Sequence, residues 1–344
     1  MNDIKHPAII KLYSAHGHVS KRLRESFDAA ITPPRPNQTT WKPKNPDIKW
    51  PPMEKEKALS KEEWINTNFP FNPLTDTFVG GVDMEVWRLK TRELLSKHPV
   101  DHGLVKLMNE VETQLTNGAS SHVGPPGTAI SKSPNWFPDP PQQLPRVVDA
   151  LASWTKGGHL AGPLFHLDEN EYKVNSIMAV SKPGGHIRVV GNLKSPKGKS
   201  FNEGINEERK KDWPVTMTTG AQFAKMIVAA GPGAYMACSD LKDAYKIIPV
   251  SLEQRKLQAY HFAGAMFIEL KLIMGDKMAC QYFDKLHYTI LHAFVYPSSH
   301  FPPVAQGRTV DDIPSVVPNN AKHALEKFVQ SYRSCLAKLN LKVL

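Results

Sequence analysis

The sequence predicts an α+β fold in which a split βαβ sheet carries helices on one face, preceded by a largely disordered and helical N-terminal region. Three observations lead to this prediction. From residue 147 onward, β-branched apolar runs alternate with stretches of helical period. Acidic residues interrupt that pattern at two places, Asp240 and the pair Asp311-Asp312. The first 58 residues combine frequent proline with lysine and tryptophan, which disfavours helix and sheet.

The composition indicates a polyanionic partner and an intracellular location. The 344 residues carry a net charge of +10, which favours nucleic acid over an anionic membrane surface, although a merely basic soluble protein is also consistent with it. The three cysteines show no metal-ligand spacing and are typical of small buried residues in a reducing compartment. Because no apolar run is long enough to span a membrane and no signal peptide is recognisable, we expect a cytoplasmic or nuclear protein without a membrane partner.

Changes in composition divide the chain into four parts. Residues 1–58 are expected to be a disordered region rich in proline and lysine. Two interpretations of this region are open: an extended linker, or a segment whose tryptophans stack on nucleic-acid bases. Residues 59–117 show helical periodicity and begin with a capping-box spacing, Ser60 to Glu63. Residues 118–146 form a linker rich in glycine, serine and proline. The main domain is therefore predicted to occupy residues 147–344.

A helix and a hairpin are predicted to open the main domain. The helix around Val147–Trp154 ends at Gly157-Gly158, and two β-like segments flank the turn 182–185. Lys182 lies at the tip of this hairpin and Arg188 on its second strand. Two cations held on a hairpin can clamp a triphosphate, although an ordinary solvated hairpin has the same sequence pattern.

The remaining elements follow in the order strand, helix, strand hairpin, helix. Turn residues and periodicity predict them in sequence: a helix at 221–230 stopped by Gly231, a buried strand at 235–240, strands at 257–262 and 266–272, a helix at 278–290, a hairpin at 309–317 bent at Asp311-Asp312, and a helix at 321–339 capped by Asn319 or Asn320. This order indicates a split βαβ sheet.

The acidic residues are the candidates for chemistry. A carboxylate at the tip of a short buried strand, as predicted for Asp240, is costly unless a cation accompanies it. If Asp311 and Asp312 converge on the same place, three carboxylates can hold two Mg²⁺ or Mn²⁺ ions. Two such ions stabilise the attacking and leaving oxygens of a phosphoryl displacement. The alternative is a pair of surface turns that contain aspartate.

Five segments in order resemble the fingers and palm of reverse transcriptases, over roughly residues 157–344. The resemblance is closest to retrotransposons that carry a tyrosine recombinase. Its motifs are SIMAVSKPGGHIRVVGNL, LKSPKGKSFNEGI, SDLKDAYKIIPVSLEQRKLQAYHF, KLIMGDKMACQYFDKL and TVDDIPSVV. The resemblance implies a right-hand polymerase fold with a ferredoxin-like palm.

The resemblance also implies a role for each matching residue. Asp240 and Asp311 would be the metal-binding carboxylates and Asp312 the third acid of the site. The remaining residues would bind the incoming deoxynucleoside triphosphate. Their implied roles are phosphate binding by Lys182, Arg188 and the peptide N–H groups of Asp243 and Ala244, a steric gate against a 2′-hydroxyl by Tyr245, and a pocket lined by Met274 and Gly275.

Three positions depart from the family pattern without removing a metal ligand. Thr309 replaces an aromatic residue, and Ile273 and Met274 replace a frequent Pro-Gln pair, so fidelity and efficiency are expected to differ. No thumb is recognised after Leu344, so a thumb, ribonuclease H or recombinase from other polyprotein segments is an expected partner.

Three functions remain open at this stage. The first is an RNA-directed DNA polymerase acting on an RNA or DNA template–primer. The second is a catalytically inactive or truncated nucleic-acid-binding remnant, and the third is a capsid-like structural protein.

Overall fold

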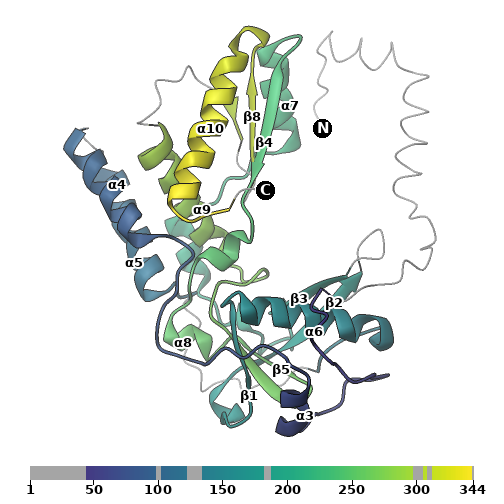
Figure 1. Ribbon diagram of the computed structural model, residues 1–344. Coiled ribbons are helices and arrows are strands. Elements are labelled where there is room, and N and C mark those ends of the chain that lie inside the picture. The colour runs from purple at the N-terminus through teal and green to yellow at the C-terminus, as the bar shows by residue number, and fades with distance from the viewer. Residues whose placement is uncertain are drawn as a thin grey trace, which may run out of the picture.

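The computed structural model describes six stretches of the chain: 44–97, 102–121, 134–181, 187–296, 305–307 and 312–342. They form a mixed α+β fold with a five-stranded and a three-stranded sheet. Figure 1 shows these two sheets at opposite ends of the molecule, with helix α9 between them. The predicted α+β class is therefore observed.

The helices in chain order are α3 (Lys61–Asn66), α4 (Met84–Lys97), α5 (His102–Asn117), α6 (Pro140–Lys156), α7 (Gly220–Ala230), α8 (Leu252–Arg255), α9 (Ala279–Thr289) and α10 (Lys322–Lys338). The strands are β1 (Leu160–Leu164), β2 (Val174–Ser181), β3 (Ile187–Asn192), β4 (Tyr235–Asp240), β5 (Ala259–Phe262), β6 (Ala265–Glu269), β7 (Ala305–Gln306) and β8 (Asp312–Val317). Two short helical segments matter for the site and the core: the 3-10 turn η6 (Ala244–Ile247) and the π-helix η7 (Ile290–Val295), which extends α9.

The five-stranded sheet has the order β1-β6-β5-β2-β3. All its neighbours are antiparallel except β2 and β5, which pair in parallel. The strands β2 and β3 pair as the expected hairpin, with Val180 opposite Arg188, and the turn 182–186 lies outside the described residues. The predicted pair of strands around Ala263-Gly264 is the β5–β6 hairpin of the same sheet.

The three-stranded sheet has the order β4-β8-β7, and β8 is antiparallel to both neighbours. The strands β4 and β7 therefore run parallel to each other on either side of β8, and α9 lies between them in the chain. This is the split βαβ arrangement that the order of elements predicts. Helix α10 follows β8 and contacts both β4 and β8.

The segment 44–58, which was expected to be disordered, packs against the five-stranded sheet. Met53 is buried there, and the ring of Trp50 stacks on Phe262 with centroids 5.8 Å apart. The backbone N–H of Leu59 donates to the carbonyl of Ala263, 3.0 Å away. The prediction was wrong for this segment because tryptophan and methionine between prolines fill an apolar surface that only the sheet provides. Residues 1–43 lie outside the described residues.

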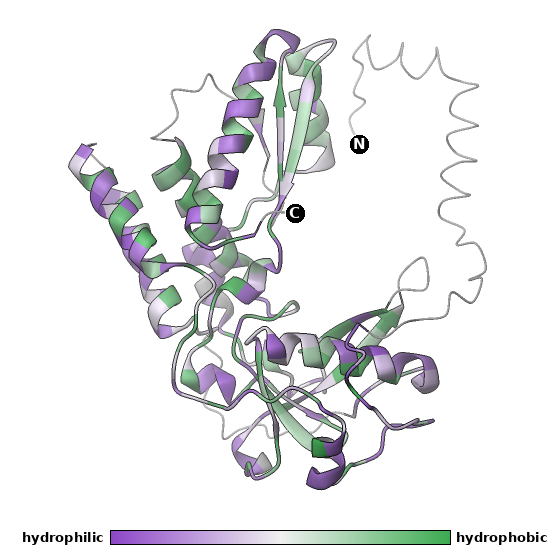
Figure 2. Ribbon diagram, viewed as in Figure 1, coloured by the Kyte–Doolittle hydropathy of each residue, from purple (hydrophilic) through white to green (hydrophobic). Residues whose placement is uncertain are grey.

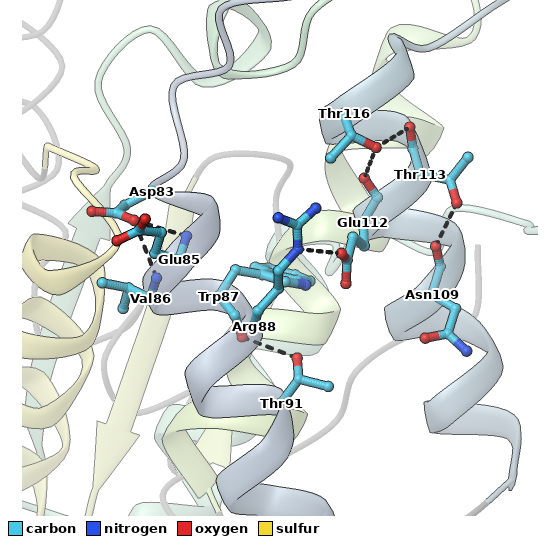
Figure 3. Close-up of polar contacts among 10 residues, drawn as sticks. All are labelled: Asp83, Glu85, Val86, Trp87, Arg88, Thr91, Asn109, Glu112, Thr113 and Thr116. Atoms are coloured by element: carbon cyan, nitrogen blue, oxygen red, sulfur yellow. Dashed lines mark hydrogen bonds and ion pairs between the residues drawn. The ribbon is translucent and has the colours of Figure 1, made fainter.

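The predicted capping box at Ser60 and Glu63 is confirmed at the start of α3. The next two helices, α4 and α5, belong to the core that also contains α9 and η7. Trp87 of α4 is fully buried and meets Phe294 edge to face, with centroids 4.9 Å apart. Figure 3 shows α4 and α5 joined on their exposed side by Arg88 and Glu112, whose Nε and Oε1 atoms are 2.7 Å apart.

Two helix boundaries differ from the predictions. Helix α6 begins at Pro140, inside the expected linker 118–146, because proline is favourable in the first turn of a helix. Helix α10 has Ala321 as its N-cap, without a side-chain hydrogen bond, since Asn319 and Asn320 belong to a preceding 3-10 turn. The predicted stop of α5 is observed at Gly118, where φ is +80° and a Cβ atom would lie 2.5 Å from the backbone of Val250. Residues 122–133 of the linker lie outside the described residues.

The strand β4 is more exposed than the predicted buried strand. Met236 is 58% exposed and Tyr235 is 37% exposed. The thiol of Cys238 is also exposed, which corrects the expectation of a buried cysteine. Figure 2 shows that α7, which contacts β8 of the same sheet, is largely apolar, yet none of its residues is buried. Within the described residues, no helix has the length and apolar character needed to cross a membrane.

Candidate nucleotide and metal site

Asp240 and Asp312 face each other across two neighbouring strands. Asp240 ends β4, Asp312 begins β8, and their Cα atoms are register partners in the antiparallel ladder. Directly opposed residues project from the same face of a sheet, with Cβ atoms about 4.5–5.5 Å apart. The two carboxylates are therefore close enough to share a cation.

The donor set suits a hard divalent cation. Carboxylate oxygens are preferred ligands of Mg²⁺ and Mn²⁺. Asp311, the other expected metal ligand, lies outside the described residues, as does Thr309. Among the residues that are described, no group of three His, Cys, Asp or Glu side chains is arranged to hold a metal. The observed pair thus fits part of a metal site, to which Asp311 would add one carboxylate.

Cys238 lies beside this acidic pair. Its thiol Sγ is 3.7 Å from Oδ1 of Asp312 and donates to it. Partial burial, followed by the negative charges of Asp312 and Asp240, raises the pKa of the thiol. The neutral thiol is therefore favoured next to the carboxylates.

The chain turns sharply after β4. Asp243 adopts the left-handed conformation, with φ 54° and ψ 38°, and η6 begins at the next residue. Successive N–H groups in such turns form concave anion sites. Ala244 is buried, and the half-buried ring of Tyr245 packs edge to face on Phe283 of α9. Contacts of Ala244 and Tyr245 with the hydrophobic core therefore fix the position of the turn.

A cavity of about 420 Å³ opens in front of this turn, a volume typical of small-ligand pockets. It lies between the two sheets. Six of the predicted site residues line it: Asp240, Asp243, Ala244, Tyr245, Arg188 and Met274. They come from β4, the following turn, β3 and the loop after β6, so residues up to 86 positions apart meet at one cavity. Lys182 cannot be placed because it lies outside the described residues.

The Met274–Gly275 loop closes one side of the cavity. Arg188 Nη1 lies 3.9 Å from the sulfur of Met274, which is a weak acceptor. The side chain of Asn202 donates to the carbonyl of Gly275 at 2.7 Å. Gly275 has φ +108°, a conformation that favours glycine. The expectation that Gly275 lines the pocket is corrected, because only its neighbour Met274 lines the cavity.

Sequence reasoning missed five cavity residues with polar or aromatic side chains: Trp154, Lys242, Lys246, Tyr260 and Glu269. Lys246 Nζ is 2.6 Å from Oε2 of Glu269, and only 1% of the Glu269 side chain is exposed. Burial raises the pKa of Glu269, and the charge of Lys246 opposes that shift. The sequence did contain a signal for these two residues, because each is a charge within an apolar run: Lys246 in YKII and Glu269 in FIEL.

The positive charge of Lys246 helps to lower the pKa of two further basic groups. Burial, followed by Lys246, lowers the pKa of His159 to about 4. Burial, followed by Arg255 and Lys246, lowers the pKa of Lys271 to about 8. The charge of Lys246 therefore favours the neutral form of both groups.

Neither a protein-family model nor a curated protein matches the chain. Among solved structures, the chain is similar to foamy virus protease–reverse transcriptases, two of which are described as prototype foamy virus proteins. A selenomethionine-labelled CSH mutant aligns over 80% of this chain and 33% of its own, with 16% identity and a TM-score of 0.45. The dRH form in complex with double-stranded DNA aligns over 79% and 45%, with 15% identity and a TM-score of 0.44. The native protein aligns over 79% and 34%, with 15% identity and a TM-score of 0.43.

The chain thus spans less than half the length of each of these proteins. The likeness is one of backbone path at low sequence identity.

Proposed function

We propose that residues 147–344 are the fingers and palm of a retroelement RNA-directed DNA polymerase, which transfers nucleotides by a two-metal mechanism. One observation carries the proposal. Residues that the sequence motifs assign to triphosphate binding, from three separate segments, line a single cavity beside Asp240. Unrelated surface turns have no reason to converge in this way.

Divalent cations fit the acidic end of the cavity. Asp240 and Asp312 would hold Mg²⁺ or Mn²⁺ together with Asp311. When bound, such ions neutralise the charge on the attacking and leaving oxygens of an in-line displacement. This requirement explains why carboxylates are placed at two adjacent strand ends.

The chain's own residues would bind and orient the nucleotide. Arg188, joined by Lys182, would bind phosphate oxygens, and the guanidinium can do so through two parallel hydrogen bonds. The N–H groups of the turn at Asp243 and Ala244 would donate to the same phosphates. Tyr245 would lie beside the sugar, where its ring excludes a 2′-hydroxyl. Phosphoryl transfer depends mainly on such positioning and on charge neutralisation.

The reaction would join the primer 3′-oxygen to the α-phosphorus of a deoxynucleoside triphosphate. The 3′-hydroxyl proton would be lost to solvent. The bond from the α-phosphorus to the oxygen that bridges the α- and β-phosphates would break, and pyrophosphate would leave. The template–primer is the expected macromolecular partner, and the net charge of +10 is suited to it.

Primer extension on an RNA template with Mg²⁺ tests the proposal. We expect deoxynucleotide incorporation by the unaltered chain and none by Asp240→Asn or Asp311→Asn. The matched control is Asp212→Asn, which alters an exposed acid outside the cavity and should leave extension unchanged.

A nucleic-acid-binding remnant is the second candidate, favoured by the net charge of +10, which suits a polyanionic partner with or without catalysis. Gel-shift binding of the template–primer without extension, under the same conditions, would support that function and exclude the polymerase.

A further inference from the structure

A buried ion pair joins the two walls of the cavity. Lys246 belongs to η6, directly after Tyr245, whereas Glu269 ends β6 of the five-stranded sheet. Their side chains meet at 2.6 Å and are only 15% and 1% exposed. Lys246 Nζ also lies 5.3 Å from the ring centroid of Trp154 in α6. The turn that follows β4 is thereby fixed to the opposite sheet.

Further contacts connect this ion pair to β3, the strand that carries Arg188. The second carboxylate oxygen of Glu269 accepts from the hydroxyl of Tyr260, 3.4 Å away. This hydroxyl lies directly beneath Gly191 of β3, where a Cβ atom would be only 2.3 Å from it. A chain of contacts therefore runs from Lys246 through Glu269 and Tyr260 to β3.

Stability alone does not account for a charged pair at this place. Replacing buried ion pairs by apolar side chains of similar size is often neutral or stabilising, because burial of both charges is costly. An ion pair nevertheless defines a distance and direction more sharply than apolar contact does. Lys246 is the residue directly after Tyr245. Because the ion pair fixes the position of Lys246, it also restricts where the Tyr245 ring can lie.

We propose that Lys246 is a positioning residue for sugar selection, which acts through Glu269 to hold the Tyr245 ring against the incoming nucleotide. This inference rests on the proposed polymerase function. Lys246 itself need not touch the nucleotide. Loss of the pair would let the turn move relative to β3, and displacements of about 1 Å at a reacting site can cost on the order of a hundredfold in rate.

The test compares affinities for dATP and ATP in the presence of Mg²⁺. The full chain is bound to an RNA template and a dideoxy-terminated DNA primer, so that binding is measured without chemistry. We expect the unaltered chain to prefer dATP, and Lys246→Met to reduce the preference by about tenfold or more, within the range that such a displacement produces. Lys246→Arg, which keeps the ion pair, should retain most of the preference.

The matched control is Lys256→Met. Lys256 pairs with Glu171 at 3.7 Å, but this pair is half-exposed and lies outside the cavity. The control should leave the ratio of the two affinities unchanged. If Lys246→Met does not fold, because Glu269 is left buried without a countercharge, the double variant Lys246→Met/Glu269→Met removes both charges and should show the same loss of preference.

Other outcomes separate the two hypotheses. An unchanged ratio in Lys246→Met, or in the double variant if only that one folds, overturns the positioning role and leaves the polymerase intact. A mere structural defect would weaken dATP and ATP binding equally, and it would also contradict the inference. Absence of any triphosphate binding by the unaltered chain overturns the proposed function and this inference with it.

Discussion

The ring of Tyr245 packs edge to face against Phe283, with centroids 6.0 Å apart, while the same residue lines the cavity. Sequence reasoning left two roles open for Tyr245, a sugar gate and a core tyrosine. The geometry is compatible with both at once, because one side of the side chain rests on α9 and another is available to a ligand. Anchoring on the core would also make the ring a stiff barrier.

Replacing Tyr245 should relax sugar selection. We expect Tyr245→Val to raise ribonucleotide relative to deoxynucleotide incorporation, by about tenfold for every 1.4 kcal/mol of steric penalty removed. Primer extension with matched pairs of nucleotides measures the ratio. Tyr235→Val, which removes a ring outside the cavity, serves as the control. A constant ratio with surviving activity would show that Tyr245 is not a gate.

Removing one carboxylate of the strand pair should weaken metal binding. Asp240→Asn deletes a charged oxygen ligand but keeps the shape of the side chain. We expect its affinity for Mn²⁺ to fall by about tenfold or more, because hydrogen bonds and ion contacts to charged groups are worth roughly 1.5–3 kcal/mol. Electron paramagnetic resonance of free Mn²⁺ measures this directly. Equal affinities of the variant and the unaltered chain would argue against a metal at this position.

Binding of a template–primer duplex should depend steeply on salt. Each phosphate contact by lysine or arginine releases counterions, so the logarithm of affinity falls with the logarithm of salt concentration by roughly 0.7–0.9 per contact. Fluorescence anisotropy between low and physiological salt measures the slope. A slope near zero is incompatible with a nucleic-acid cleft in this basic chain.

Acidification should destabilise the fold through His159. Burial and Lys246 lower its pKa from 6.5 to about 4, so the folded chain keeps the imidazole neutral. Below about pH 6.5 the unfolded chain takes up a proton that the folded chain does not, and stability falls until about pH 4. Above pH 6.5 this contribution to stability is present in full.

Urea unfolding at a series of pH values measures the effect of His159. We expect His159→Gln to show a smaller loss of unfolding free energy between pH 6.5 and 4. The exposed His323 on α10 provides the control, since His323→Gln should follow the unaltered chain. Parallel curves for His159→Gln and the unaltered chain would contradict this assignment.

Local sequence signals predicted most elements of the main domain. The hairpin β2–β3, the helix ended by Gly231 and the strand ended by Asp240 follow from turn residues and short-range periodicity. Such signals act within a few residues, and so they are readable without a tertiary structure. The approach of Asp240 to Asp312 was also predictable, but only through the order of motifs and the resemblance that they carry.

Other features depended on contacts between distant segments. The packing of Trp50 and Met53 on the five-stranded sheet could not be inferred locally, because prolines around them indicate an extended chain and nothing nearby marks the apolar surface that receives them. The exposure of β4 was missed for the related reason that an apolar run does not reveal how many of its faces are covered.

The sequence by itself determined the alternation of strands and helices, the acidic strand ends and the residues expected around a nucleotide. Only the tertiary structure decided that Lys246 and Glu269, 23 residues apart, form a buried pair across the cavity. A single charge in an apolar run shows that a partner is needed, since its burial alone is costly. Which partner satisfies it depends on how two separate sheets meet, and that is set by packing of the whole chain.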